Sequence, residues 1–201
     1  RKRWEKTVFS KPDIIVCDTH AHARFFEDTF SLPAEKFKVL YVGAESYFYG
    51  TCRREISRAP FNILFYGSFL ELQGVNTIVE AAALSRDKPA VWTLIGDGPC
   101  LEQAQQKAAG LDHIRFKSWM TYAKLRQHIF DADIVLGIFG DTPKAAMVIP
   151  NKVFQAMAAG KPLITRVSDA YRQNIAGHPA VGWVAPDDPA GLSAVVNEWI
   201  D

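Results

Sequence analysis

The sequence predicts an α/β protein with a Rossmann-like, doubly wound parallel sheet. Along most of the chain, short runs of β-branched and aromatic residues alternate with helical stretches. Strands that are separated by helices of about ten residues form right-handed βαβ crossovers, which build a parallel sheet. In addition, the run at 133–138 (DIVLGI) is apolar on both faces, as expected of a central strand that helices cover on both sides.

The first 60 residues hold few elements. In chain order, we expect a helix, a strand, a second helix and a second strand over residues 2–10, 13–18, 20–30 and 37–42. Residues 43–60 contain glycines, aromatic residues and Pro60 without a sustained helical or strand period, which indicates a connector.

From Phe61 onward the alternation is regular. The predicted strands are 61–66, 91–95, 113–116, 133–138, 162–166 and 181–184. The predicted helices are 73–85, 99–109, 121–131, 151–159, 169–176 and 188–200. Because parallel strands end at the same edge of a sheet, a ligand is expected at the turns that follow them.

Composition argues against several classes of protein. The formal net charge of +1 gives no long-range field that favours nucleic acid or an anionic membrane surface. The cysteines Cys17, Cys52 and Cys100 are odd in number and far apart, so we expect a reducing cytoplasm and neither a disulfide framework nor a zinc site. No apolar run reaches about 18 residues, so no transmembrane helix is predicted. The chain begins without Met and directly in a helical stretch, so we expect a fragment of a longer protein.

The turn after the 61–66 strand runs from Gly67 to Gly74. Glycines lack a Cβ and let backbone amides approach a phosphate, but a tight turn without a ligand has the same spacing. Val75 and Asn76 follow Gly74, where a P-loop has Lys and then Ser or Thr, so a P-loop NTPase is excluded.

The turn after the 91–95 strand contains Gly96-Asp97-Gly98-Pro99. It lacks the third glycine of the dinucleotide fingerprint, and a lone GxG is a weak signal. A structural turn with Pro99 at the first helical position explains the same residues equally well.

A third turn precedes the helix predicted at 151–159. Its N-terminus offers free amides and the positive end of the helix dipole to an anion. Lys152 and Gln155 lie one turn apart on one face, which points either into a cleft or, in a helix without a ligand, into solvent. The preceding segment 139–150 is long, irregular and contains a glycine, which favours the cleft.

Together these features resemble a known family. The pair Gly67 and Gly74, then LIGDGP at 94–99, ADIV at 132–135 and QAMAAGKPLIT at 155–165 follow the order found in the retaining group 1 glycosyltransferases of the GT-B fold. The resemblance implies a nucleotide-sugar donor domain at 56–201. It implies that residues 1–55 are the end of the N-terminal acceptor domain and its linker, and that most of the acceptor domain is missing from this chain.

The resemblance also implies a donor site without a metal or another cofactor. A UDP- or GDP-linked sugar would bind there, and the hexose would pass to a growing polysaccharide or a lipid-linked glycan. The 67–74 loop would cover the diphosphate. The family usually has Arg after the first glycine and Lys before the second, where this chain has Ser68 and Gln73. Lys152 and Lys144 are the candidates to replace these cations.

The family has two glutamates eight positions apart, one near the transferred sugar and one at the ribose. Met147 stands at the first position, which puts its catalytic role in question, and Gln155 stands at the second. The run 149–152 (IPNK) is similar to a Pro-x-Lys loop of some subgroups, which makes Lys152 the catalytic candidate. The base is expected beside Lys117 and Trp119, although Trp119 in the core is an alternative. The expected donor contacts are Gly67, Ser68, Gln73, Gly74, Gly96, Gly98, Lys117, Trp119, Lys144, Ile149, Asn151 and Gln155.

Other interpretations stay open at this point. Asp131 and Asp133 form a DxD triplet, but they precede a strand rather than follow it, so no metal site is predicted. The missing Arg, Lys and Glu residues are compatible with a catalytically silent subunit that binds a nucleotide sugar. A different Rossmann enzyme, such as a dehydrogenase or an epimerase, is a further alternative. For the full-length protein we expect no nucleic-acid partner, and we leave room for a peripheral contact with the inner face of the cytoplasmic membrane.

Overall fold

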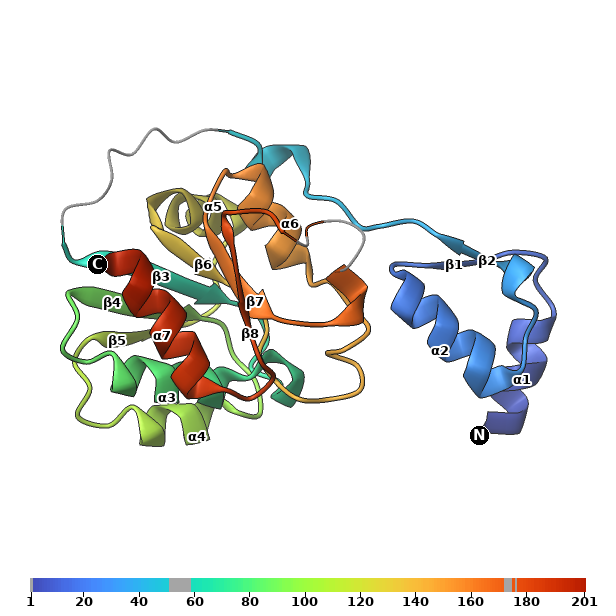
Figure 1. The fold of residues 1–201 in the computed structure, drawn as a ribbon, viewed down its shortest axis with the longest axis horizontal. Helices are drawn as coiled ribbons and strands as arrows, with labels where there is room; N and C mark the ends of the chain where they lie inside the picture. Colours follow the sequence, from blue (N-terminus) through green and yellow to red (C-terminus); the bar gives the residue numbers. More distant parts are fainter. Residues whose placement is uncertain (1, 51–58, 172–174, 176) are drawn as a thin grey trace.

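The computed structural model describes residues 2–50, 59–171, 175 and 177–201. Within these residues the strands form two sheets, one of two strands near the N-terminus and one of six strands. Figure 1 shows helices on both sides of the six-stranded sheet, with the N-terminal elements beside it as a smaller unit. The prediction of an α/β fold with a doubly wound parallel sheet is confirmed.

The six-stranded sheet consists of β3 (Phe61–Tyr66), β4 (Ala90–Ile95), β5 (Ile114–Lys117), β6 (Ile134–Leu136), β7 (Leu163–Arg166) and β8 (Val181–Val184). Its spatial order is β5-β4-β3-β6-β7-β8, and all neighbouring strands are parallel. The chain fills one half of the sheet from β3 outward and then returns to fill the other half from β6. The order therefore reverses between β3 and β6, and ligands of doubly wound proteins bind beyond the strand ends at such a reversal.

Helices cover both faces of this sheet (Figure 1). One face carries α3 (Val75–Leu84), α4 (Leu101–Lys107) and α7 (Pro189–Ile200), and the other carries α5 (Tyr122–Asp131) and α6 (Asn151–Ala158). Strand β3 shows why both faces are covered. Ile63 and Phe65 pack in the core on the side of α3, α4 and α7, and Leu64 and Tyr66 pack in the core on the side of α5 and α6. Successive side chains of a strand point to opposite faces, so a strand with no polar side reads as a continuous apolar run.

The smaller unit contains α1 (Lys2–Ser10), β1 (Ile15–Cys17), α2 (His20–Phe30) and β2 (Phe37–Val39). The strands pair in parallel, and Phe9 of α1 packs on Phe26 and Phe30 of α2 with ring centres 5.0 and 5.2 Å apart. Thr19 caps α2 by accepting a hydrogen bond from the His22 amide. Its hydroxyl also donates to the backbone carbonyl of Met147, which links the two units.

The described residues depart from the predicted boundaries in a few places. The strands predicted at 37–42 and 133–138 are shorter, with bounds Phe37–Val39 and Ile134–Leu136. The helix predicted at 169–176 is wrong for the residues that can be compared, because Asp169–Tyr171 forms a single 3-10 turn. Residues 172–174 and 176 lie outside the described part of the chain. That turn is enough to bury Tyr171, whose ring packs edge-on against Trp183 at 5.1 Å.

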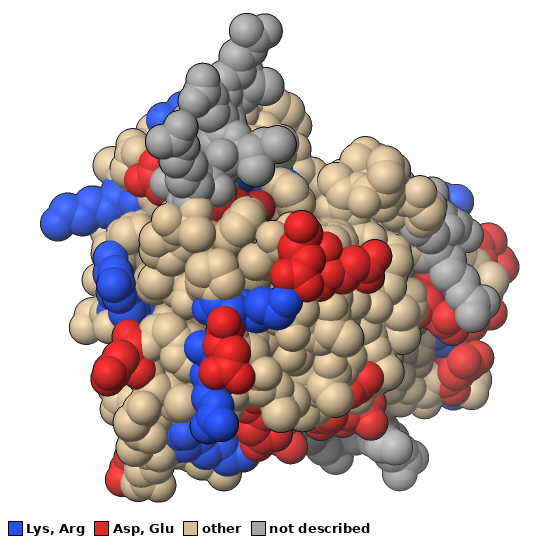
Figure 2. Space-filling model, turned by 60° about the vertical axis from the view of Figure 1, so that its left-hand side comes forward, with Lys and Arg blue, Asp and Glu red and all other residues tan. Residues whose placement is uncertain are grey.

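Charged side chains of both signs are mixed on the surface. In the face that Figure 2 shows, acidic and basic residues lie next to one another over a largely uncharged surface. Lys88 pairs with Asp201 at 2.5 Å, and Lys107 pairs with Glu80. No helix within the described residues has both the length and the apolar character that a membrane span needs.

Candidate functional site

A cavity of about 450 Å³ lies where the carboxyl ends of β3, β4 and β5 approach the N-termini of α5 and α6. It is therefore on the α5 and α6 side of the point where the strand order reverses. Its walls come from segments far apart in the sequence, and its volume lies within the range of small-molecule sites. The lining residues are Tyr66, Gly67, Ser68, Gln73, Ile95, Trp119, Met120, Tyr122, Leu125, Pro150, Asn151, Lys152 and Gln155.

The loop after β3 forms the first wall, with Gly67, Ser68 and Gln73 at the cavity. The Gly96–Gly98 turn supports this loop from behind. A Cβ on Gly96 would lie 1.9 Å from the Gly67 carbonyl oxygen, and one on Gly98 would lie 2.8 Å from the Phe69 amide nitrogen. Phe69 also donates a 2.8 Å hydrogen bond to the Asp97 carbonyl. The two glycines thus hold the loop in place and do not line the cavity themselves.

Gly74 ends the same loop in the left-handed conformation, with φ of +67°. A Cβ at this position would lie 2.5 Å from the Gly140 amide nitrogen. The loop backbone therefore packs directly against the segment that follows β6, which only a glycine permits. Gly74 fixes the path of the loop from outside the cavity.

Helix α6 forms the second wall. It starts after Pro150 without a side-chain cap, and Pro150, Asn151 and Lys152 line the cavity. The uncapped first turn leaves backbone amides and the positive end of the helix dipole at this wall. An anion in the cavity would therefore face favourable partial charges from the backbone alone.

Lys152 is a buried cation at this wall, with only 5% of its surface exposed. Its Nζ donates a 2.5 Å hydrogen bond to Gln73 Oε1 and lies 3.9 Å from the centre of the Phe65 ring. Among the described residues no carboxylate forms an ion pair with it. Burial lowers the pKa of Lys152 well below its usual value, because the charged form has lost its water. An anionic ligand would restore the missing partner.

Gln155 lies one turn further along α6 and is 4% exposed. Its Oε1 accepts a 2.9 Å hydrogen bond from the Tyr66 hydroxyl, and its Nε2 donates a 2.9 Å hydrogen bond to Glu45 Oε2. Burial, and then the Glu45 carboxylate, raise the pKa of Tyr66. The phenol is therefore a neutral donor at the cavity wall.

The third wall is aromatic and apolar. Trp119 is 56% exposed and lies at the cavity with Met120, which also precedes α5, and with Tyr122 and Leu125 of the helix itself. The interpretation of Trp119 as a core residue is therefore wrong. An exposed indole face beside a cavity can stack on a planar ring.

The structure brings together seven of the predicted site residues at the cavity, namely Gly67, Ser68, Gln73, Trp119, Asn151, Lys152 and Gln155. The interpretation in which Lys152 and Gln155 point into solvent is wrong, since both are buried. Seven other residues do not line it: Gly74, Gly96, Gly98, Lys117, Lys144, Met147 and Ile149.

Several of these outlying residues have other surroundings. Ile149 packs in the core, whereas Lys144 is exposed. Lys117 is also exposed, and its Nζ lies 3.4 Å from His128 Nε2. Met147 contributes its backbone carbonyl to the contact with Thr19.

Sequence reasoning missed Glu45, Tyr66 and Tyr122. Tyr66 follows directly from the strand period, because the last residue of β3 faces the α6 side. Glu45 carries no comparable signal, since it stands in a segment without periodicity, 110 positions from Gln155.

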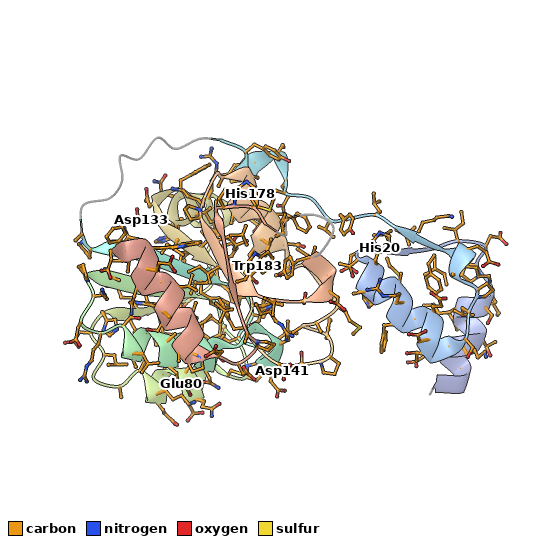
Figure 3. The ribbon with its side chains drawn as sticks, viewed as in Figure 1. His20, Glu80, Asp133, Asp141, His178 and Trp183 are labelled. Carbon is orange, nitrogen blue, oxygen red and sulfur yellow. The ribbon has the colours of Figure 1, made fainter. Side chains whose placement is uncertain are left out.

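A metal site is not indicated among the described residues, where no group of three or more His, Cys, Asp or Glu side chains comes together. Figure 3 places Asp133 and Asp141 at opposite ends of the sheet. The Asp133 carboxylate accepts a 2.7 Å hydrogen bond from the backbone N–H of Asn62. The second Asp of the DxD triplet is therefore a structural residue, at the end of the sheet away from the cavity.

Comparison with known proteins bears on the same region. Residues 60–201 match the family model described as "Glycosyl transferases group 1". The probable glycosyltransferase WbjE of Pseudomonas aeruginosa is 26% identical over 143 residues, which cover 67% of this chain and 34% of WbjE. The chain thus spans about a third of that relative's length.

Two solved structures share the fold. HepE of Anabaena, solved in complex with UDP-glucose, superposes with a TM-score of 0.83 at 16% identity and covers 100% of this chain, which corresponds to 57% of HepE. The C-terminal domain of the group 1 glycosyl transferase LpcC of Francisella tularensis gives a TM-score of 0.62 at 19% identity over 77% of this chain and 85% of that domain. The chain belongs to the group 1 glycosyltransferases of the GT-B fold and matches the region of their C-terminal domain.

Proposed function

We propose that this chain binds the diphosphate and nucleoside of a UDP- or GDP-linked sugar in the 450 Å³ cavity, as the donor half of a retaining hexosyltransferase. The buried Lys152 carries this proposal, because no described carboxylate pairs with it and it faces the cavity beside the uncapped start of α6. A cation and free amides at one wall are complementary to a diphosphate.

The three walls fit the parts of such a ligand. The 67–74 loop and the start of α6 would hold the diphosphate, with Lys152 in place of the cations that Ser68 and Gln73 do not supply. Gln155 would bind the ribose, and Trp119 would stack on the base. The complex of HepE with UDP-glucose supports a donor of this class.

In the transfer step, the bond between the sugar C1 and the diphosphate oxygen breaks. C1 forms a bond to the oxygen of an acceptor hydroxyl, and the proton of this hydroxyl passes to the departing diphosphate. Negative charge grows on the departing diphosphate, and positive charge on the sugar ring. Amides and a lysine that are already in place stabilise the departing group without reorganisation. The proposal needs no metal and no cofactor.

The acceptor is proposed to be a growing polysaccharide or a lipid-linked glycan, bound by an N-terminal domain of which residues 1–55 would be the end. On this division, residues 56–201 are the donor domain. Contacts from both domains would be needed for transfer. The described cysteines Cys17 and Cys100 are free thiols, which agrees with the reducing cytoplasm that we propose as the location. A peripheral contact of the full-length protein with the inner face of the membrane is a separate part of the proposal and does not rest on these thiols.

Calorimetric titration of the 201-residue chain with UDP, GDP, ADP and NAD tests the proposal. We expect binding of UDP or GDP, weaker binding of ADP and NAD, and no sugar transfer by this chain alone. Binding of NAD in preference to UDP and GDP would contradict the donor-site proposal. Efficient transfer by the chain alone would contradict the need for a further domain.

A second candidate is a catalytically silent subunit that binds the nucleotide sugar. It is favoured by one observation, since Met147 stands where the family has its first glutamate and contributes only a backbone carbonyl to the contact with Thr19. Turnover by the full-length protein, measured under conditions where donor binding is demonstrated, separates the two candidates.

A further inference from the structure

Glu45 lies outside the six-stranded unit in sequence but contacts its cavity wall in space. Its Oε2 accepts the 2.9 Å hydrogen bond from Gln155 Nε2, and Gln155 lines the cavity. The carboxylate is exposed to solvent. Among the described residues, it has no cationic partner.

The segment that carries Glu45 is fixed on the main unit. Glu45 precedes the 3-10 turn η2 (Ser46–Phe48), and Phe48 is 1% exposed in the core beside α5 and α6. The Phe48 ring packs edge-on against Tyr122 at 5.8 Å. Arg126 of α5 donates a 2.8 Å hydrogen bond to the Tyr47 carbonyl. The contacts of Tyr47 and Phe48 therefore fix the backbone next to Glu45 and keep Glu45 beside Gln155.

The two hydrogen bonds of Gln155 fix the orientation of its amide. A carboxylate can only accept, so the amide NH2 must face Glu45, and Oε1 then faces the Tyr66 hydroxyl, which donates. This orientation leaves one N–H of Gln155 available as a donor. A ribose hydroxyl that accepts from this N–H can donate its own proton to the Glu45 carboxylate beside it.

We propose that Glu45 is a ribose-binding residue of the donor site, which restores from the connector the carboxylate that Gln155 itself lacks. This inference rests on the proposed nucleotide-sugar function. It assigns Gln155 and Glu45 to one composite subsite, in which the amide donates and the carboxylate accepts. In this subsite the Glu45 carboxylate accepts from the 2′-hydroxyl. It therefore discriminates between a ribose and a 2′-deoxyribose, because 2′-deoxyribose keeps the 3′-hydroxyl but lacks this donor.

The test compares UDP and GDP with 2′-deoxy-UDP and 2′-deoxy-GDP by calorimetric titration of the 201-residue chain. We expect the wild-type chain to bind the better ribonucleotide about tenfold more tightly than its deoxy form, as for one charge-assisted hydrogen bond. In Glu45→Gln this ratio should fall to about twofold or less, because a neutral amide oxygen is a weaker acceptor. Glu45→Asp, which keeps the charge and shortens the side chain, should give an intermediate ratio.

Glu35→Gln is the matched control, because Glu35 is exposed in the 3-10 turn η1 (Ala34–Lys36) and, unlike Glu45, accepts no described hydrogen bond from a residue that lines the cavity. It should keep the wild-type ratio. Because the ratio is measured within one protein, a loss of folded material in a variant does not change it.

Three outcomes would count against the inference. An unchanged ratio in Glu45→Gln, with the ribonucleotide still bound, would overturn the role of Glu45 and leave the proposed function intact. Tighter binding of both forms by Glu45→Gln would also overturn that role, because Glu45 would then obstruct the site. Absence of nucleotide binding in the wild-type chain would overturn both proposals.

Discussion

Lys152 Nζ and Gln73 Oε1 lie 2.5 Å apart, and this hydrogen bond joins the first turn of α6 to the loop after β3. A neutral amide oxygen solvates the ammonium group but does not balance its charge. The ring of Phe65 on the other side contributes a weak attraction of its own. The ammonium group at the cavity wall therefore has no anionic partner among the described residues, and a bound phosphate would supply one.

Replacement of Lys152 by Met should weaken nucleotide binding. Met has a similar length and no charge, so the change removes the cation with little loss of packing. We expect a loss of about 1.5–3 kcal/mol, or roughly 10- to 150-fold in the dissociation constant of UDP or GDP. Titration calorimetry measures this difference. The control Lys38→Met, at an exposed position of β2, should bind as the wild-type chain does, and equal affinities in both variants would rule out a role for Lys152.

The same replacement should stabilise the chain without ligand. A buried cation without a carboxylate partner is costly in the folded state, and an apolar side chain of similar volume avoids this cost. We expect a gain of about 1 kcal/mol, or roughly 2–4 °C in the melting temperature near pH 7. Thermal unfolding followed by circular dichroism should show the gain, and a lower melting temperature for Lys152→Met would contradict this account of the site.

The pKa of Lys152 predicts how affinity and stability depend on pH. Burial lowers this pKa in the free chain, and a bound diphosphate should raise it again. Affinity should therefore fall as pH rises from the lowered pKa toward the pKa of the complex, and binding should take up protons in that window. The unfolded chain holds this proton more tightly than the folded one, so the free energy of unfolding should rise with pH between the lowered pKa and the usual value.

Titrations in buffers with different ionisation enthalpies measure this proton uptake. The uptake should be absent in Lys152→Met, and the pH dependence of its unfolding should be flatter. Equal uptake in wild-type chain and variant would assign the proton to another group.

Trp119→Ala should weaken nucleotide binding with little effect on folding. The side chain is 56% exposed at the rim of the cavity, so its removal leaves no hole in the core. Stacking of a base on an aromatic ring contributes about 1–3 kcal/mol, and we expect a loss of that size for UDP or GDP. Trp4→Ala, at a position of α1 that is 71% exposed, is the matched control. If Trp119→Ala and Trp4→Ala bind UDP or GDP with the same affinity, the base does not stack on Trp119.

Gly74→Ala and Gly160→Ala separate backbone conformation from close packing. Both glycines are left-handed, with φ of +67° and +65°, but a Cβ on Gly74 would meet the Gly140 backbone at 2.5 Å whereas nothing lies within 4 Å at Gly160. Gly160→Ala should cost about 1 kcal/mol for conformation alone. Gly74→Ala should cost a further 1–3 kcal/mol or so, because backbone must move. Urea unfolding measures the change in the free energy of unfolding of both variants. Equal changes would show that the backbone around Gly74 moves to accept a Cβ at no cost.

The fold was predictable because its signals are local. Strand β3 and helix α2 have the bounds expected from the sequence, since each is a continuous apolar or helical run between clear stops. Lys152 and Gln155 could also be placed at the cavity. A helix that starts after a long loop from a parallel strand begins at the carboxyl edge of the sheet, where ligands of such folds bind.

The contacts of the site were less predictable because they are not local. The pairing of Gln155 with Glu45 spans 110 positions and depends on the path of an irregular segment. The roles of Gly96 and Gly98 were ambiguous for a related reason. A glycine that carries a ligand and a glycine that admits another loop have the same sequence signature, and here the neighbour is the Gly67–Phe69 backbone.

The packing of Phe48 on α5 and α6 also determines where the chains of two family members can be joined in a chimera. The family region begins at residue 60, yet a chimera joined there would leave Phe48 and Glu45 on the other parent. A foreign connector would then have to fill the same apolar gap and supply a matching partner for Gln155. A crossover placed before Glu45 would transfer the cavity together with Phe48 and with the hydrogen-bond partner of Gln155.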